Sequence, residues 1–115
     1  AFSTTSFILS GSCPDGVILQ HAPGREFRCD FDQMVMPLPA AEINLIQTFS
    51  DTRVIGLTIN HENMTDADVS AAVDAYECEL GIPATDALTH SPDRLVDIVL
   101  GAFPELEEKL TACTL

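Results

Sequence analysis

Each of the three histidines follows a short apolar run. His21 follows GVILQ, His61 follows VIGLTIN, and His90 follows ATDALT. An imidazole can take up or release a proton near neutral pH and can bind a metal ion, so these positions could carry chemistry. If the apolar runs are strands separated by helices, the βαβαβ order predicts a parallel sheet with right-handed crossovers. The three strand ends then share one edge, which is where open α/β sheets bind ligands.

Other groups that could bind a ligand follow the first two strands. In HAPGR, Pro23 and Gly24 suit the centre of a type II turn, which would place Arg25 beside the strand end. A guanidinium can hold a carboxylate or phosphate with two hydrogen bonds, and a glycine lets the backbone approach the same anion. The simpler alternative is an ordinary turn that carries a surface arginine.

The ends of the second and third predicted strands also carry polar side chains. The amide of Asn60 can both donate and accept hydrogen bonds, which suits the edge of a purine, although asparagine also commonly ends strands. Glu62 and Asn63 follow His61, and Thr89 precedes His90. Three imidazoles at one edge could form a metal site with an open position for water. We assign no metal ligands, because each histidine could equally be a loop residue bonded to the backbone.

The elements expected to position these residues are three parallel strands and the helices between them. The strands are predicted at 16–21, 53–60 and 84–89, and residues 3–10 are predicted to end a helix. A helix should start at Pro39 with Ile43, Ile46 and Phe49 on one stripe, and another should run from the N-cap Thr65 to Gly81. A third helix should open at Ser91-Pro92-Asp93 with Leu95, Val96, Val99 and Phe103 facing inward, and a short acidic helix should follow Pro104. Residues 26–38 are expected to form an irregular loop over the sheet edge.

The length and composition predict one compact α/β unit over residues 1–115. The chain has 115 residues, 46% of them hydrophobic, which suffices for a single core. Three strands are few for a doubly wound sheet, and the first residue is not Met, so we expect a C-terminal fragment of a larger domain. A sheet with an unpaired edge can also join a second copy, which makes a homo-oligomer one expected assembly.

The charge and hydropathy exclude several classes of partner. Eighteen acidic residues against five basic ones give a formal charge of −13, which repels phosphate backbones and anionic lipids. No apolar run approaches the roughly 20 residues that span a bilayer. We therefore expect a soluble, cytoplasmic protein that binds a small-molecule substrate and neither nucleic acid nor membranes. The sequence lacks G-x-x-x-x-G-K-[ST], G-x-G-x-x-G and G-x-S-x-G. No local motif therefore supports a phosphate loop, a dehydrogenase or a serine hydrolase within this chain.

Three stretches, GSCPDGVILQHAPGR, VIGLTINHENMT and GIPATDALTHSPDRLVDIVL, resemble a bacterial and archaeal P-loop-like family of unknown function. Some of its members carry an NAD-dependent epimerase/dehydratase label, and it includes DgcN-type D-glutamate N-acetyltransferases. The resemblance covers nearly the whole chain. It implies that the chain is the C-terminal half of a P-loop NTPase-like α/β domain, without the phosphate loop itself. That domain would follow an N-terminal domain with a dinucleotide-fold-like architecture.

The resemblance also implies an activity and roles for the residues at the strand ends. The activity would be transfer of an acetyl group from acetyl-CoA to the amino group of D-glutamate, with the isolated chain inactive. His21 and Arg25 would be the catalytic residues, the first taking the ammonium proton and the second holding a carboxylate. Acetyl-CoA or ATP would be bound by Gly24, Asn60, His61 and Thr89. The alternative is a nucleotide-binding domain with an ATP-binding or structural role, whereas an NAD-dependent oxidoreductase has no fingerprint in these residues.

Overall fold

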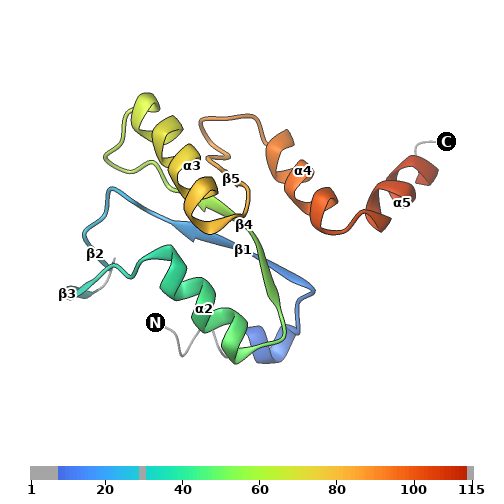
Figure 1. Ribbon diagram of the computed structural model, residues 1–115, viewed down its shortest axis with the longest axis horizontal. Helices are drawn as coiled ribbons and strands as arrows, with labels where there is room; N and C mark the ends of the chain where they lie inside the picture. The colour runs from blue at the N-terminus through green and yellow to red at the C-terminus, as the bar shows by residue number, and fades with distance from the viewer. Residues whose placement is uncertain (1–7, 29–30, 114–115) are drawn as a thin grey trace.

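A computed structural model describes residues 8–28 and 31–113 of the protein (Figure 1). Residues 8–12 are helical, and the earlier part of the predicted first helix, residues 3–7, lies outside the described residues. The elements that follow are β1 (Gly16–His21), β2 (Phe27–Arg28), β3 (Phe31–Val35), α2 (Pro39–Phe49), β4 (Arg53–Ile59), α3 (Asp66–Leu80), β5 (Ala84–Thr85), α4 (Asp93–Ala102) and α5 (Glu105–Cys113). Within the described part of the chain, no helix combines the length and the apolar character needed to cross a bilayer.

The main sheet has three parallel strands in the order β1-β4-β5, which confirms the predicted fold class. Strand β1 pairs with β4 along its whole length, from Gly16 opposite Arg53 to His21 opposite Ile59. The third strand is much shorter than predicted, since it ends at Thr85 and not at residue 89. The backbone N–H groups of Leu88 and Thr89 donate to Oδ1 of Asp86, at 2.9 and 3.3 Å, and this turns the chain away from the sheet.

Helix α2 covers the face of the sheet on which the core lies. Ile46 of α2 packs with Val54 of β4 and Leu9, and Val17 and Leu19 of β1 lie against this cluster. Because side chains alternate along a strand, His21 shares this face with Val17 and Leu19. The predicted apolar stripe of α2 is thus correct for Ile43 and Ile46, which pack in this cluster. Phe49, at the end of the same stripe, is half exposed.

Helix α4 packs against β4 through Ile98, which the sequence analysis did not place inward. A β-carbon added at Gly56 would lie 2.7 Å from Cγ2 of Ile98, so the glycine lets the helix approach the strand. Val96 was predicted to face inward and is 50% exposed. It lies two residues from Ile98, about 200° around the helix at roughly 100° per residue, and so points the other way. The helix begins at Asp93, whose N–H donates to Oγ of Ser91 at 3.3 Å.

Helix α3 has the boundaries expected from the sequence. The Thr65 side chain accepts the Asp68 N–H at 3.2 Å, and the Asp68 carboxylate accepts the Thr65 N–H at 3.0 Å, which forms a capping box. Gly81 ends the helix with φ of +68°, a conformation that glycine adopts without strain. The capping box thus ends the loop that joins β4 to α3, and Gly81 begins the loop that leads to β5.

The segment predicted as an irregular loop contains a small hairpin. Strands β2 and β3 pair antiparallel as a separate two-stranded sheet, and the N–H of Met36 donates to the carbonyl of Glu26 at 2.9 Å. Met34 and Val35 are largely exposed, so the hairpin adds little to the core. The flanking prolines and the mixture of polar and apolar residues hide the period-two pattern of so short a pair.

Candidate functional site

The strand-end loops of β1 and β4 lie against each other. The N–H of Asn60 donates to the His21 carbonyl at 2.8 Å, which extends the pairing of β1 and β4 by one step. Beyond this point, a β-carbon at Gly24 would lie 2.3 Å from the carbonyl oxygen of Glu62, so only glycine fits between the two loops. In this structure, the close approach that Gly24 permits is between two segments of backbone.

The turn at Gly24 differs in type from the prediction. The Arg25 N–H donates to the Ala22 carbonyl at 3.1 Å, which closes a four-residue turn as expected. A type II turn requires a positive φ at its third residue, but among the described glycines only Gly81 has one. The type II assignment was therefore wrong, and the glycine is needed for the close approach to Glu62.

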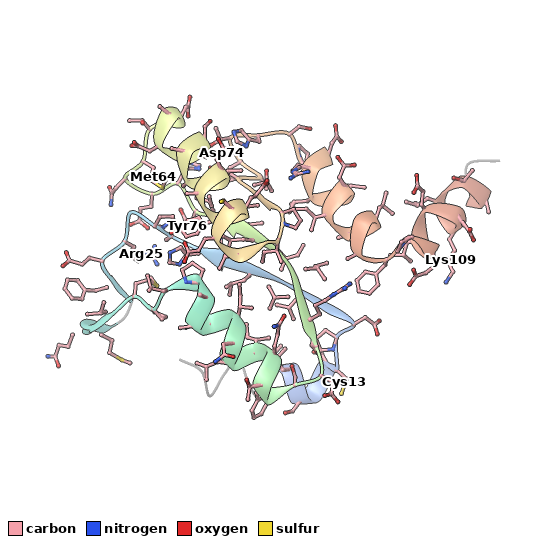
Figure 2. All side chains as sticks on the ribbon, in the orientation of Figure 1. Cys13, Arg25, Met64, Asp74, Tyr76 and Lys109 are labelled. Atoms are coloured by element: carbon pink, nitrogen blue, oxygen red, sulfur yellow. The ribbon has the colours of Figure 1, made fainter. Side chains whose placement is uncertain are left out.

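Arg25, the predicted anion-binding group, pairs with the carboxylate of Glu62. Both Nε, at 3.1 Å, and Nη2 donate to Oε2 of Glu62. Asn60 supports this pair, because its side-chain oxygen accepts the N–H of Glu62 at 3.1 Å. Figure 2 shows Arg25 on the loop after β1, on the side of the ribbon where Met64 leads into α3. The guanidinium therefore already holds a carboxylate at this edge.

A second polar cluster joins the end of β4 to the turn after β5. Nδ1 of His61 lies 2.6 Å from Oδ2 of Asp86, and the Thr89 hydroxyl donates to the same oxygen at 2.8 Å. The Thr89 oxygen also lies 3.3 Å from Nδ1 of His61. The Asp86 side chain is 1% exposed, whereas that of His61 is 41% exposed. The cluster thus presents an accessible imidazole backed by a buried carboxylate.

The hydrogen bonds to Asp86 keep it ionised. Burial raises the pKa of its carboxyl, but the donors from Leu88, Thr89 and His61 outweigh burial and hold the pKa below its ordinary value. An ionised carboxylate only accepts hydrogen bonds, so a neutral His61 carries its proton on Nδ1 and keeps a lone pair on Nε2. Nε2 has no hydrogen-bond partner among the described residues.

His21 lies in a different environment from His61. Its ring meets Tyr76 of α3 edge to face, with 5.7 Å between ring centroids and 87° between the ring planes. Burial lowers the pKa of His21, and the negative charge of Glu42 on α2 opposes this only in part. A small hollow of about 150 Å³ lies beside it, lined by Leu19, Gln20, His21, Met36, Pro37 and Glu42. This imidazole is half buried between α2 and α3 and is held neutral.

The structure brings most of the predicted site residues together in two groups. Gly24, Arg25 and Asn60 meet at the first two strand ends, and His61 meets Thr89 at the second and third. His90 is exposed, and its backbone N–H donates to the Asp86 carbonyl at 2.8 Å. The three imidazoles have different surroundings, and within residues 8–28 and 31–113 no three side chains of His, Cys, Asp or Glu are placed to hold a metal ion.

Sequence reasoning missed Asp86 and gave Glu62 no role. Asp86 stands inside a predicted strand, but its spacing of three residues before Thr89 is that of a side-chain-stabilised turn and could have revealed it. Glu62 was recognised as a strand-end residue, but its partner is 37 residues away in the sequence. No local pattern predicts a pairing over that separation.

Comparison with known proteins identifies the family. Residues 1–96 match the model of a domain of unknown function described as the DUF1611 C-terminal P-loop domain. The chain belongs to this family. A crystal structure of a DUF1611 family protein from Anabaena variabilis ATCC 29413 matches 84% of the chain with a TM-score of 0.76 and 23% sequence identity. The match supports the P-loop-domain fold that the sequence predicted.

One relative has a named activity. The chain is 26% identical over 102 residues to a D-glutamate N-acetyltransferase from Tritonibacter scottomollicae, an alignment that covers 81% of the chain. The chain spans 29% of the length of that relative and 30% of the Anabaena structure. The activity of the whole relative therefore enters below only as a proposal.

Acetyl-CoA and ATP both carry an adenine ring and phosphates, and this edge offers different groups to the two parts. Asn60 uses its side-chain oxygen within the loop, which leaves the amide nitrogen able to donate to an adenine ring. The sequence contains no glycine-rich phosphate loop, and Arg25 is engaged by Glu62. We therefore assign no residue of this chain to the phosphates of either molecule.

Proposed function

We propose that this chain forms one side of the substrate site of an N-acetyltransferase, which moves an acetyl group from acetyl-CoA to the amino group of an acidic D-amino acid. The observation that carries the proposal is the contact of Gly24 with the Glu62 carbonyl. It holds the guanidinium of Arg25 beside Glu62 at the strand-end edge, where the imidazole of His61 also lies. Open α/β sheets bind ligands at this edge. The named relative supports the choice of D-glutamate as the substrate.

The chemistry of the transfer needs the two kinds of group that this edge offers. An amino acid at neutral pH carries an ammonium group, which must lose a proton before its nitrogen can attack an acyl carbon. A histidine is suited to accept that proton, and at this edge His21 ends β1 and His61 follows β4. A dicarboxylic substrate also needs a cation for its carboxylates. In the proposed complex, Arg25 exchanges its partner Glu62 for one of them.

A nucleotide-binding domain without transferase activity is the second candidate. It is favoured by the P-loop description of the matching family model and by the side-chain amide of Asn60, a group suited to an adenine ring. The two candidates differ in their products, because a transferase releases the thiol of CoA, whereas a nucleotide-binding domain releases no thiol and releases phosphate if it hydrolyses the ATP that it binds.

The full-length natural protein decides between them. Purified protein is incubated with acetyl-CoA and D-glutamate, L-glutamate or D-alanine, and thiol release is followed with a chromogenic disulfide. We expect release with D-glutamate, and weaker release with D-alanine, which lacks the side-chain carboxylate. Phosphate release from ATP without any amine-dependent thiol release would support the second candidate and contradict the transferase.

A further inference from the structure

The carboxylate of Asp86 is held by donors from three residues. Oδ1 accepts the N–H groups of Leu88 and Thr89, and Oδ2 accepts the Thr89 hydroxyl and lies 2.6 Å from Nδ1 of His61. With the side chain 1% exposed, water cannot replace these partners. The turn that ends β5 therefore fixes the orientation of the Asp86 carboxylate. The carboxylate can then fix the orientation of the His61 ring.

We infer that His61 is the catalytic proton acceptor of this site and that Asp86 is its positioning residue. This inference rests on the proposed N-acetyltransferase function. A carboxylate at Nδ1 holds the neutral imidazole in the tautomer whose lone pair is on Nε2, and it stabilises the imidazolium that forms when Nε2 takes a proton. Because the His61 side chain is 41% exposed, Nε2 remains accessible to a substrate at the strand edge.

The same features set His61 apart from His21. Among the described residues, a carboxylate is hydrogen-bonded to the ring of His61 and none is hydrogen-bonded to the ring of His21. His21 is instead packed edge-on against Tyr76, on the face of the sheet that α2 covers. A positive charge on His21 would form in a partly desolvated position, whereas the charge on His61 would face Asp86.

The proposed transfer begins with the loss of a proton from the substrate. The substrate ammonium gives one proton to Nε2 of His61, and the resulting amine attacks the thioester carbonyl carbon. The C–N bond forms and the C–S bond breaks, so that the electron pair leaves with the thiolate. The second nitrogen proton passes to water, and the imidazolium returns its proton to the thiolate. The net products are the N-acetyl amino acid, the free thiol and one proton.

Kinetics of variants of the full-length protein test the inference. His61→Gln should lower kcat for D-glutamate by about 10² to 10³ fold, as expected for loss of a general base. Asp86→Asn should lower kcat at least about tenfold while KM for D-glutamate stays within about threefold, because the residue acts through His61 and does not touch the substrate. His90→Gln is the matched control, since His90 is exposed, and it should stay within about twofold of wild type.

Two further readouts separate positioning from a merely structural role. The loss in His61→Gln should shrink as the pH approaches the pKa of the substrate ammonium, where the amine forms without a base. In ¹⁵N NMR spectra, neutral His61 should show the Nδ1–H tautomer in wild type and lose that preference in Asp86→Asn or in the milder Thr89→Val. Because these spectra need no turnover, they also report on a variant with impaired activity.

The possible results distinguish failure of the inference from failure of the proposed function. Wild-type turnover by His61→Gln, in a protein that transfers acetyl groups, would overturn the inference and leave the function standing. An unchanged His61 tautomer in both Asp86→Asn and Thr89→Val would overturn the role of Asp86. Absence of acetyl transfer in the wild-type protein would overturn the proposed function itself and, with it, the catalytic role of His61.

Discussion

Gly24 meets the carbonyl oxygen of Glu62 so closely that a β-carbon on residue 24 would lie 2.3 Å from that oxygen. The contact joins the loop after β1 to the loop after β4, which are 37 residues apart in the sequence when measured from Arg25 to Glu62. It also fixes the direction in which both loops leave the sheet. The ion pair of Arg25 with Glu62 spans the same two loops.

Gly24→Ala should therefore destabilise the protein, because the added methyl group meets backbone and cannot be relieved by a side-chain rotation. We expect a loss of about 1–3 kcal/mol in the free energy of unfolding, measured by urea titration. Gly101→Ala is the control, since no heavy atom lies within 4 Å of a β-carbon there. Gly101 lies in the last turn of α4, where alanine gains only part of its roughly 1 kcal/mol helix-interior advantage over glycine, so this variant should be at least as stable as wild type. Equal stability of Gly24→Ala and wild type would show that the two loops can separate freely.

Arg25→Lys should keep the charge of the strand-edge cation and lose its planar pair of donors. In the full-length protein we expect kcat/KM for D-glutamate to fall about 10 to 100 fold, the effect of losing one charged hydrogen bond of roughly 1.5–3 kcal/mol. Arg94→Lys is a matched control, because Arg94 of α4 also pairs with a carboxylate, that of Glu77 on α3, but is not part of the candidate site. If both variants fold and keep wild-type efficiency, the HAPGR segment is an ordinary turn with a surface arginine.

The sequence was sufficient to predict the elements whose signals are local. The N-cap Thr65 and the terminal Gly81 define α3 within the sequence, and the apolar runs of β1 and β4 need no distant partner to be recognised. Strand β5 was predicted too long because the side chain of Asp86 captures backbone donors that a strand would otherwise use. A side chain that competes with backbone pairing is not visible in a hydropathy pattern.

The sequence predicted that the candidate residues share an edge of the sheet, but not which residues pair there. Parallel strand ends meet at one edge by topology alone, and Arg25 and His61 both follow strands that end at this edge. The carboxylate that Arg25 or His61 contacts depends on the course of the loops beyond the strands. Glu62 reaches Arg25 because Gly24 permits the close approach of the loops, and Asp86 reaches His61 because β5 ends early.

The stability of the protein should depend on the protonation of His21. Burial lowers the pKa of His21 from its ordinary value of 6.5, an effect only partly opposed by Glu42 on α2, while Tyr76 on α3 contributes no charge near neutral pH. The folded chain therefore binds fewer protons than the unfolded chain just below pH 6.5, and stability rises with pH through that region. His21→Gln should reduce this rise, as measured by urea unfolding between about pH 5 and 7. An unaltered pH dependence would mean that His21 is equally solvated in both states.

Asp86→Asn should remove a stabilisation that operates only while the carboxyl is ionised. The pKa of Asp86 lies below its ordinary value of 3.8 in the folded chain, because its hydrogen bonds outweigh the opposing effect of burial. The unfolded chain then takes up the proton first, so the stabilisation is complete above pH 3.8 and is lost as the pH falls through the folded pKa. At neutral pH, the ionised Asp86 carboxylate accepts the hydrogen bonds from Leu88, Thr89 and His61. The variant should therefore be less stable by about 1.5–3 kcal/mol at this pH.

The deficit of Asp86→Asn relative to wild type should therefore shrink when unfolding is measured at successively lower pH, from about pH 7 to below the ordinary carboxyl pKa. Asp74→Asn provides the control, since Asp74 is exposed on α3 (Figure 2) and should leave stability within about 0.5 kcal/mol of wild type at neutral pH. A deficit that stays constant through the acid range would show that Asp86 stabilises the turn after β5 through its shape alone. In that case an asparagine misfit, and not the charged contact with His61, would account for the loss.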